Sequence, residues 1–232
     1  MIGAACGLVM VLVVLAGGYF LMNSRTYQLA GRLVDRVATS EKVVALTLDD
    51  GPTDHAREVL DILSTADIPA TFYLNGHDLA ARPELGRAIA AAGHEIGNHT
   101  YNHRRMVLVS PETVADEVER TDTEIRRTGY LGEITFRPPY CKKLWTLPDY
   151  LSDHDRTTVT WDVEPDTGNS SAAEIVEATT EQVRPGSIIL LHTMFGSGAA
   201  ARAAIGPIVD KLRADGYRFV TVSDLIGRAG PP

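Results

Sequence analysis

From residue 42 onward, segments with the pattern of β-strands alternate with segments with the pattern of α-helices. The predicted strands are residues 43–48, 70–74, 94–97, 134–136, 157–161, 187–191 and 218–222. Helical patterns fall between most of them, at residues 56–66, 82–92, 111–128, 171–183 and 199–214. Regular strand-then-helix alternation gives a mostly parallel sheet covered by helices, and about seven units suggest a barrel or near-barrel. We therefore expect an α/β domain at residues 42–232.

The size and charge of the chain limit what this domain can do. With 232 residues, 44% of them hydrophobic, the chain can bury one sizeable core. The net charge of -8 comes without a basic patch, which argues against a nucleic-acid-binding protein. Two cysteines, Cys6 in the apolar N-terminus and Cys141 in the domain, cannot supply a disulfide framework.

Residues 1–22 contain no charged side chain. A run of this length is enough to cross a bilayer of about 30 Å hydrocarbon thickness as a helix. A cleaved signal peptide is the alternative, with Val14-Leu15-Ala16 as a small-residue cleavage site. Because the run is long and no basic region precedes it, we favour an uncleaved transmembrane anchor.

Residues 23–41 link this segment to the first strand. Leu29, Leu33, Val34 and Val37 recur at helical spacing, which predicts an amphipathic helix as a short stalk. A helix over residues 23–41 would span about 28 Å, so the domain would stay close to the membrane. By the positive-inside rule, three arginines after the span would place this side in the cytoplasm: Arg25, Arg32 and Arg36.

The first strand ends in two adjacent carboxylates, within "LTLDDGPT" at residues 46–53. Asp49 and Asp50 repel each other, and each loses solvation if it is held in a cleft. Most such pairs are solvated loop residues. In parallel α/β folds, however, active-site residues come from the carboxyl ends of the strands. Other reactive residues at strand ends would therefore favour an active site over a loop.

Two histidines follow the predicted strand 94–97, within "NHTYNH". On a helical turn, the spacing of His99 and His103 would place both imidazoles on one face, where they could hold one metal ion. Two histidines and one carboxylate form a facial triad with open positions for water and substrate. Such a pair is common by chance, but this one shares a sheet edge with the Asp pair. We interpret the remaining histidines as structural or surface residues: His55, His77, His94 and His154.

Two further strand ends carry reactive side chains. Arg137 follows strand 134–136 in "RPPY" and offers a fixed fork of donors suited to a carboxylate; the alternative is a surface arginine on a rigid loop. His192 ends the apolar strand 187–191 and can act as a general acid or base once a carboxylate orients it. Three acids after strand 157–161 are candidates for that orienting group: Asp162, Glu164 and Asp166.

Five short motifs occur in order along the chain: "TLDDG", "HTYNH", "FRPPY", "WDVEPD" and "ILLH". In order and spacing they resemble the five motifs of the polysaccharide deacetylases, the NodB homology domain of carbohydrate esterase family 4. The resemblance covers residues 42–226. Its first three motifs are highly specific together, and the fourth is loose. The resemblance implies a distorted (β/α) barrel, which agrees with the alternation of strands and helices.

The resemblance assigns a separate role to each carboxylate of the Asp pair. Asp50, His99 and His103 would hold one divalent metal ion, commonly Zn2+ in this family, with Co2+, Mn2+, Ni2+ or Fe2+ as other candidates. Asp49 would be the general base that takes a proton from the metal-bound water. The charge of the metal makes the adjacent carboxylates tolerable and lowers the pKa of that water towards neutrality.

The same resemblance implies roles for residues of the later motifs. Arg137 would pair with Asp49, and the backbone N–H of Tyr140 would help to stabilise the oxyanion. His192 would protonate the leaving amine, with Asp166 or Glu164 tuning it. The substrate pocket would be lined by Leu190, Pro139 and Trp161.

Three positions depart from the motifs of the family. Cys141 stands where the third motif usually continues with Gly, and could be an extra metal ligand, an oxidation-sensitive switch or a small residue in Gly's place. Thr167 stands where the fourth motif usually has Trp. Thr193 stands where the fifth motif usually has Asp. None of these changes removes a ligand or a proton carrier, so they bear on substrate preference more than on activity.

Together these features predict a metal-dependent N-deacetylase acting on amino sugars of a cell-surface glycan, with peptidoglycan preferred over other N-acetylglucosamine polymers. The catalytic domain would lie outside the cell membrane, tethered by its N-terminal helix, or be secreted if that segment is cleaved. Here the family resemblance outweighs the count of arginines. We expect no nucleic-acid partner and a monomer.

Two alternatives stay open. The first is an O-acetyl esterase on a carbohydrate, for which the altered fourth motif leaves room. The second is a non-catalytic, membrane-tethered glycan-binding protein. Loss of a metal ligand or of the base would favour this second alternative, but all the motif residues are present: Asp49, Asp50, His99, His103, Arg137 and His192.

Overall fold

A computed structural model describes residues 2–229, apart from the side chains of residues 2–6 and 8. The parts of the predicted segments 1–22 and 42–232 that fall on residue 1 and on residues 230–232 lie outside the described residues. So does the side chain of Cys6.

The centre of the fold is a parallel sheet built around strand β2 (Val43–Asp49), whose residues are all buried. β2 pairs with β3 (Thr71–Leu74), β6 (Ile188–Leu191) and β7 (Arg218–Val220), and β3 pairs with β4 (Glu95–Asn98). A strand that is covered on both faces reads as a nearly continuous apolar run, and this explains "VVALTL".

Side chains of β2 alternate between two cores. Val44, Leu46 and Leu48 pack in the larger hydrophobic cluster, together with apolar residues of the surrounding helices. Val43 and Ala45 pack in a second cluster on the opposite face of the strand. Because successive side chains of a strand point to opposite faces, the last residue of β2 shares the face of Val43 and Ala45. That face is the interior of the barrel.

The sheet curves towards closure through short pairings. β1 (Leu33–Val34) pairs with β5 (Thr158–Val159), and the backbone of Phe136 bridges both Asn98 and Thr158. An antiparallel bridge from Arg36 to Ser187 joins the β1 segment to the start of β6. The expected parallel, barrel-like α/β fold is therefore confirmed, with predicted strand 134–136 reduced to the bridges at Phe136.

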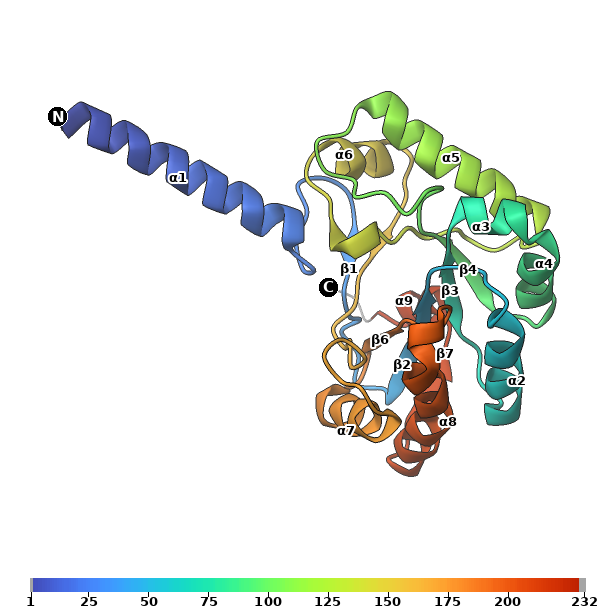
Figure 1. The fold of residues 1–232 in the computed structure, drawn as a ribbon. Coiled ribbons are helices and arrows are strands. Elements are labelled where there is room, and N and C mark those ends of the chain that lie inside the picture. Colours follow the sequence, from blue (N-terminus) through green and yellow to red (C-terminus); the bar gives the residue numbers. More distant parts are fainter. Residues whose placement is uncertain (1, 230–232) are drawn as a thin grey trace.

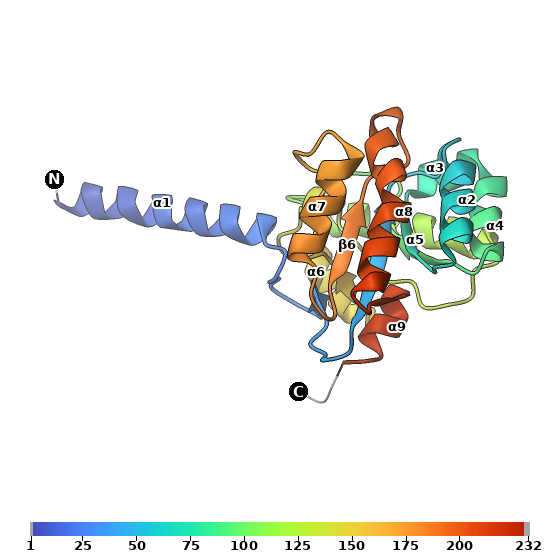
Figure 2. The same cartoon turned by 90° about the horizontal axis from the view of Figure 1, so that it is seen from below.

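Helices cover the outside of this sheet (Figures 1 and 2). Five of them lie where the sequence predicts helices: α2 (Ala56–Ala66), α4 (Pro83–Ala91), α5 (Pro111–Arg127), α7 (Ala172–Gln182) and α8 (Ala199–Ala214). Ser110 and Ser171 begin α5 and α7 as N-caps, because their hydroxyl oxygens accept hydrogen bonds from Thr113 N and Glu174 N.

Sequence patterns miss several short elements. They are α3 (Gly76–Ala81), α6 (Thr146–Asp153), α9 (Val222–Ile226) and the 3-10 turns η1 (Pro139–Cys141) and η2 (Gly196–Gly198). Each of these elements has eight residues or fewer, which is too short for an apolar repeat at helical spacing to stand out in the sequence. The predicted strand 218–222 also ends early, because Thr221 accepts a hydrogen bond from Asp224 N and caps α9.

The N-terminal segment forms a long helix, α1 (Ile2–Asn23), which projects from the domain (Figures 1 and 2). Across the part of the chain that the structure describes, no helix has the length and apolar character needed to cross a membrane. The membrane span expected at residues 1–22 is not confirmed.

The helical stalk predicted for residues 23–41 is wrong. This segment is extended and includes β1, and it receives hydrogen bonds of 2.9 Å from Thr158 N to Arg32 O and from Thr160 N to Val34 O. Val34 and Val37 are buried in the inner core. Pairing with β5 satisfies backbone groups and buries these valines, which outweighs a helical pattern of only four apolar residues. Residues 33–37 thus form part of the barrel wall.

Candidate metal centre and catalytic cleft

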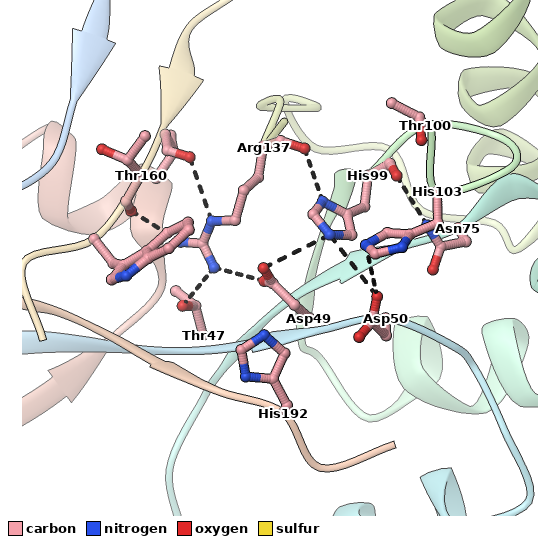
Figure 3. Close-up of polar contacts among 12 residues, drawn as sticks. Thr47, Asp49, Asp50, Asn75, His99, Thr100, His103, Arg137, Thr160 and His192 are labelled. Carbon is pink, nitrogen blue, oxygen red and sulfur yellow. Dashed lines mark hydrogen bonds and ion pairs between the residues drawn. The ribbon is translucent and has the colours of Figure 1, made fainter. Parts of the chain in front are cut away.

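The residues singled out by the sequence converge at the carboxyl ends of β2, β4 and β6 (Figure 3). Seven of them line a cavity of about 440 Å3. Its lining includes seven expected site residues (Asp49, Asp50, His99, His103, Tyr140, Trp161, His192) and five others (Asn23, Arg25, Cys141, Glu164, Thr167).

The two adjacent aspartates point in different directions because the backbone turns between them. Asp49 is the last residue of β2, whereas Asp50 has a left-handed φ of 75°. Gly51 continues the turn with a φ of 76°, where a Cβ would lie 2.9 Å from Thr53 N. Asp49 therefore faces Arg137, and Asp50 faces the histidines (Figure 3).

Asp50, His99 and His103 bring ligand atoms together, with all three atoms within 4.8 Å of one another. Nε2 of His103 lies 3.2 Å from Oδ1 of Asp50, and Nε2 of His99 lies 3.9 Å from the same oxygen. Nδ1 of His99 is 2.7 Å from the carbonyl oxygen of Arg137, to which it donates, so the lone pair of Nε2 faces the cluster. Two imidazoles and one carboxylate arranged in this way fit a divalent metal ion.

The spacing of His99 and His103 predicted a helical turn, and this prediction is wrong. Both histidines lie in the loop after β4, where Thr100 and His103 have left-handed φ values of 65° and 52°. The tight loop brings the two rings to a centroid distance of 5.0 Å. Burial and the neighbouring His99 lower the pKa of His103, which favours the neutral imidazole that a metal requires.

Two asparagines that the sequence analysis missed hold this loop. Asn75 donates a 2.8 Å hydrogen bond to the carbonyl oxygen of His99. Oδ1 of Asn98 accepts from Thr100 N at 2.9 Å, while its amide donates to Val118 O. Asn75 directly follows the predicted strand 70–74, so the strand-end rule applied to every strand would have found it.

Arg137 is fully buried, and the alternative of a surface arginine is wrong. Its Nη1 donates to Oδ1 of Asp49 at 2.6 Å and to Oγ1 of Thr47 at 2.8 Å. The remaining donors bind the carbonyl oxygens of Thr160 at 3.0 Å and Val159 at 3.3 Å. The fork is thus fixed on all sides, and it fixes the carboxylate of Asp49 in turn.

Asp166 is the carboxylate that contacts His192, out of the three candidates. Its Oδ2 lies 3.2 Å from Nδ1 of His192 and accepts a 2.6 Å hydrogen bond from the backbone N–H of that residue. Burial disfavours the imidazolium, but the bond to Asp166 and the charges of Asp49 and Asp50 outweigh it and raise the pKa of His192 to about 9.

The other two candidate acids have different partners. Glu164 accepts hydrogen bonds from Trp161 Nε1 and Thr167 Oγ1, both at 2.9 Å. Asp162 accepts from Ser187 Oγ and from the backbone N–H of Ile188, both at 2.9 Å. Asp162 therefore belongs to the barrel wall, and Glu164 to the wall of the cavity.

The expected pocket residues surround the cavity or lie just behind it. Tyr140 has a left-handed φ of 56°, and its ring centroid lies 4.6 Å from that of His103. Trp161 and Leu190 both belong to the inner core cluster, and Pro139 is buried in η1.

Cys141 fills space beside the metal cluster. The residue is 5% exposed, and its thiol donates to Ser24 O at 3.4 Å. Burial raises the pKa of this thiol, so it stays protonated at neutral pH. Within the described residues, the cluster suited to a metal consists of Asp50, His99 and His103 without Cys141. These facts agree with the interpretation of Cys141 as a small residue in Gly's place.

Comparison with known proteins gives consistent matches. The family model described as polysaccharide deacetylase matches residues 36–159. A Bacillus cereus protein named peptidoglycan-N-acetylglucosamine deacetylase is 31% identical over 201 residues, which cover 84% of this chain and 93% of that protein. A chitooligosaccharide deacetylase of Sinorhizobium fredii is 36% identical, with 69% of this chain and 76% of that protein covered.

Solved structures agree with the sequence matches. The crystal structure of a peptidoglycan N-acetylglucosamine deacetylase superimposes with a TM-score of 0.80 at 29% sequence identity. The superposition covers 84% of this chain and 92% of that one.

Proposed function

This chain belongs to the polysaccharide deacetylase family, carbohydrate esterase family 4, and is an enzyme of that family. We propose that it is a metal-dependent hydrolase that removes N-acetyl groups from the amino sugars of peptidoglycan. The proposal is carried by the Asp50–His99–His103 cluster beside the buried ion pair of Asp49 and Arg137. The names of the peptidoglycan deacetylases among its relatives support the choice of glycan.

Asp50, His99 and His103 would hold one divalent cation, for which we propose Zn2+. When bound there, such a cation supplies Lewis acid chemistry: it polarises the acetyl carbonyl and makes an attacking water easier to deprotonate. His99 is prepared for this role because its Nδ1 is committed to the carbonyl oxygen of Arg137.

Asp49 acts as the general base. Asp49 lines the cavity; its Oδ1 is held by Arg137 at 2.6 Å, while its Oδ2 lies 3.7 Å from Nε2 of His99. Oδ2 is therefore the oxygen that takes the proton of the attacking water. The backbone N–H of Tyr140 stabilises the negative charge that develops on the acetyl oxygen.

His192 acts as the general acid for the leaving nitrogen. Nδ1 of His192 is bound to Asp166, which leaves Nε2 to carry the proton that is transferred. The raised pKa, about 9, keeps the imidazole protonated at neutral pH, as this role requires. Leu190, Trp161 and Pro139 would form the wall against which the acetyl methyl packs.

We also propose that this chemistry takes place outside the cytoplasmic membrane, where peptidoglycan lies. Attachment of residues 1–22 to that membrane stays a prediction from the sequence. Cell fractionation with the native N-terminus, followed by protease treatment of intact cells, tests both statements. A protein that stays in the cytosolic fraction would contradict them.

Acetate release by the full chain from peptidoglycan tests the proposed function. Activity should disappear after chelation, return with Zn2+, and be at least about 100-fold lower in Asp49→Asn. Asp54→Asn is the matched control, because the side chain of Asp54 is 93% exposed and lies outside the cavity lining. Release that survives complete chelation would refute the metal dependence. A metal-loaded protein that releases no acetate from peptidoglycan would refute the choice of glycan.

A further inference from the structure

The last residue of α1 and the residues directly after it form part of the wall of the catalytic cleft. Asn23 and Arg25 line the same cavity as Asp50 and His192. The carbonyl oxygen of Arg25 accepts a 2.6 Å hydrogen bond from Oγ1 of Thr160. This attachment places a segment that precedes the family match of residues 36–159 directly beside the reacting groups.

Residues directly after the third motif also hold this segment. The carbonyl oxygen of Ser24 accepts from the thiol of Cys141 and from Nζ of Lys143. Nζ of Lys142 contacts Oδ1 of Asn23. The segment from Asn23 to Arg25 therefore has a defined position, and the Arg25 side chain starts from a fixed backbone.

The guanidinium of Arg25 is fixed at one edge and open at the other. Its Nη2 donates to Oε2 of Glu164 at 2.6 Å, and its central carbon lies 4.9 Å from the centroid of the Trp161 ring. Glu164 is only 14% exposed, whereas the Arg25 side chain is 45% exposed. Within the described residues, the hydrogen bonds of this guanidinium use Nη2 alone. Nη2 donates one of its two N–H groups to Glu164, so its second N–H and the adjacent N–H of Nη1 or Nε remain available to a ligand in the cavity.

Cationic side chains lie around the cleft, beside the carboxylates of Asp49, Asp50 and Glu164 that also line it. The chain has a net charge of -8, yet Arg25 borders the cavity and Lys142 contacts the neighbouring Asn23. On the Tyr140 side, the guanidinium of Arg105 lies 4.8 Å from the tyrosine ring centroid. Cationic side chains at both sides of the cleft favour a substrate that carries negative charge.

We propose that Arg25 is a substrate-binding residue that selects glycans bearing a carboxylate close to the acetylated amino group. The proposal rests on the function proposed above and narrows its substrate to carboxylated sugar chains, such as those containing muramic acid, over neutral N-acetylglucosamine polymers. The free second N–H of Nη2 and the N–H group beside it can bind a carboxylate through two parallel hydrogen bonds, while the first N–H of Nη2 stays on Glu164.

The test compares two versions of one substrate. The first is a peptide-free tetrasaccharide of alternating N-acetylglucosamine and N-acetylmuramic acid, and the second is the same molecule with its carboxylates converted to primary amides. The measured quantity is the ratio of kcat/KM for the acid to kcat/KM for the amide. For the full-length wild type, this ratio should be about 10 or more, since hydrogen bonds between charged groups are the strong ones.

Three variants of the full chain complete the design. Arg25→Gln should bring the ratio close to 1, mainly through KM, and Arg25→Lys should retain part of the preference because it keeps the charge without the fork. Arg32→Gln is the matched control, because Arg32 is an exposed arginine of the same segment that does not line the cavity. Melting temperatures verify that each variant is folded.

The outcomes separate this proposal from the proposed function. A wild-type ratio near 1, or a wild-type ratio retained by Arg25→Gln, would overturn the role of Arg25 even if acetate release proves the enzyme active. If the wild type releases no acetate, the proposed function is refuted. Calorimetry then tests Arg25 by comparing the dissociation constants of the acid and the amide tetrasaccharide. Equal dissociation constants for acid and amide would then overturn the role of Arg25 as well.

Discussion

Nη1 of Arg137 donates a 2.6 Å hydrogen bond to Oδ1 of Asp49, and both side chains are buried beneath the cleft. The same Nη1 binds Thr47, which lies two residues before Asp49 on the same face of β2. The position of Asp49 therefore depends on a guanidinium that is itself held by backbone carbonyls of Val159 and Thr160. Orientation of the base and stability of the barrel interior are linked through one side chain.

Arg137→Met should cost both stability and activity. It leaves the carboxylate of Asp49 buried without its cation, and removal of one partner from a buried pair lowers the free energy of unfolding by about 3–5 kcal/mol. Urea unfolding and acetate release measure the two effects. Arg184→Met serves as control, because Arg184 lies 3.6 Å from Asp162 and its side chain is 63% exposed. Equal unfolding free energies for the two variants would contradict the role of Arg137.

Asp49→Asn and Asp50→Asn should fail for different reasons. Asp49→Asn removes the base and should lower kcat by about 100- to 10,000-fold while the protein still binds its metal. Asp50→Asn removes a carboxylate ligand and should lose metal on dialysis. Metal content and kcat, measured on the same samples, distinguish the two. Loss of metal from Asp49→Asn to the same extent would show that both carboxylates are ligands.

Much of this site could be predicted because its parts end buried strands. Long apolar runs marked β2 and β6, and the residues after them were therefore assigned to one edge of the sheet. Asp49, Asp50 and His192 do meet there, lining one cavity. The rule uses local pattern and the geometry of parallel sheets, both of which a single sequence contains.

The parts that could not be predicted depend on contacts distant in sequence. The apolar spacing within residues 23–41 fits a helix, and only the pairing with β5 explains why Leu33 and Val34 form a strand. Arg25 reaches Glu164 across 139 positions of the chain, so nothing local marks it as part of the cleft. The loop that carries His99 and His103 likewise adopts left-handed backbone angles that their spacing does not reveal. Asn75, by contrast, directly follows a predicted strand, so the sequence alone marks it as a residue of this edge of the sheet.

The activity of the enzyme should fall as the pH rises, because His192 loses the proton that it donates. Nδ1 of His192 is bound to Asp166, and the pKa of His192 is raised to about 9, so the acid form dominates below that pH and is lost above it. A cation held by Asp50 offsets part of the nearby negative charge, which places the alkaline limb of the loaded enzyme at or below pH 9. Asp166→Asn removes a partner that raises the pKa and should move this limb to lower pH. A profile of kcat/KM against pH that is identical for both proteins would contradict the pairing.

Substitution of His192 should separate amide from ester hydrolysis. An amine leaves only when protonated, whereas an alkoxide is a better leaving group, so His192→Ala should abolish N-acetyl hydrolysis and only weaken O-acetyl hydrolysis. Acetate release from an N-acetylated and an O-acetylated sugar gives the comparison. His55→Ala is a suitable control, since this histidine lies outside the cavity lining and contacts Glu58. Equal losses of acetate release from both substrates would show that His192 is not the general acid.

His94 should make the fold sensitive to acid independently of catalysis. Its Nδ1 accepts a 3.3 Å hydrogen bond from Ala70 N, and burial lowers its pKa from 6.5 to about 4. Between these values the unfolded chain binds a proton that the folded chain resists. The free energy of unfolding should therefore fall, by at most about 3 kcal/mol, as the pH drops from 6.5 to 4.

Urea unfolding of the wild type and His94→Gln across this pH range isolates the effect. Burial raises the pKa of the adjacent Glu95, which acts in the opposite direction, because the folded chain then binds the extra proton. Glu95 is present in both proteins, so its contribution cancels in the difference between their curves. His154→Gln, which changes an exposed histidine at the end of α6, should retain the pH dependence of the wild type. If His94→Gln retains it too, the loss of stability in acid arises from other groups.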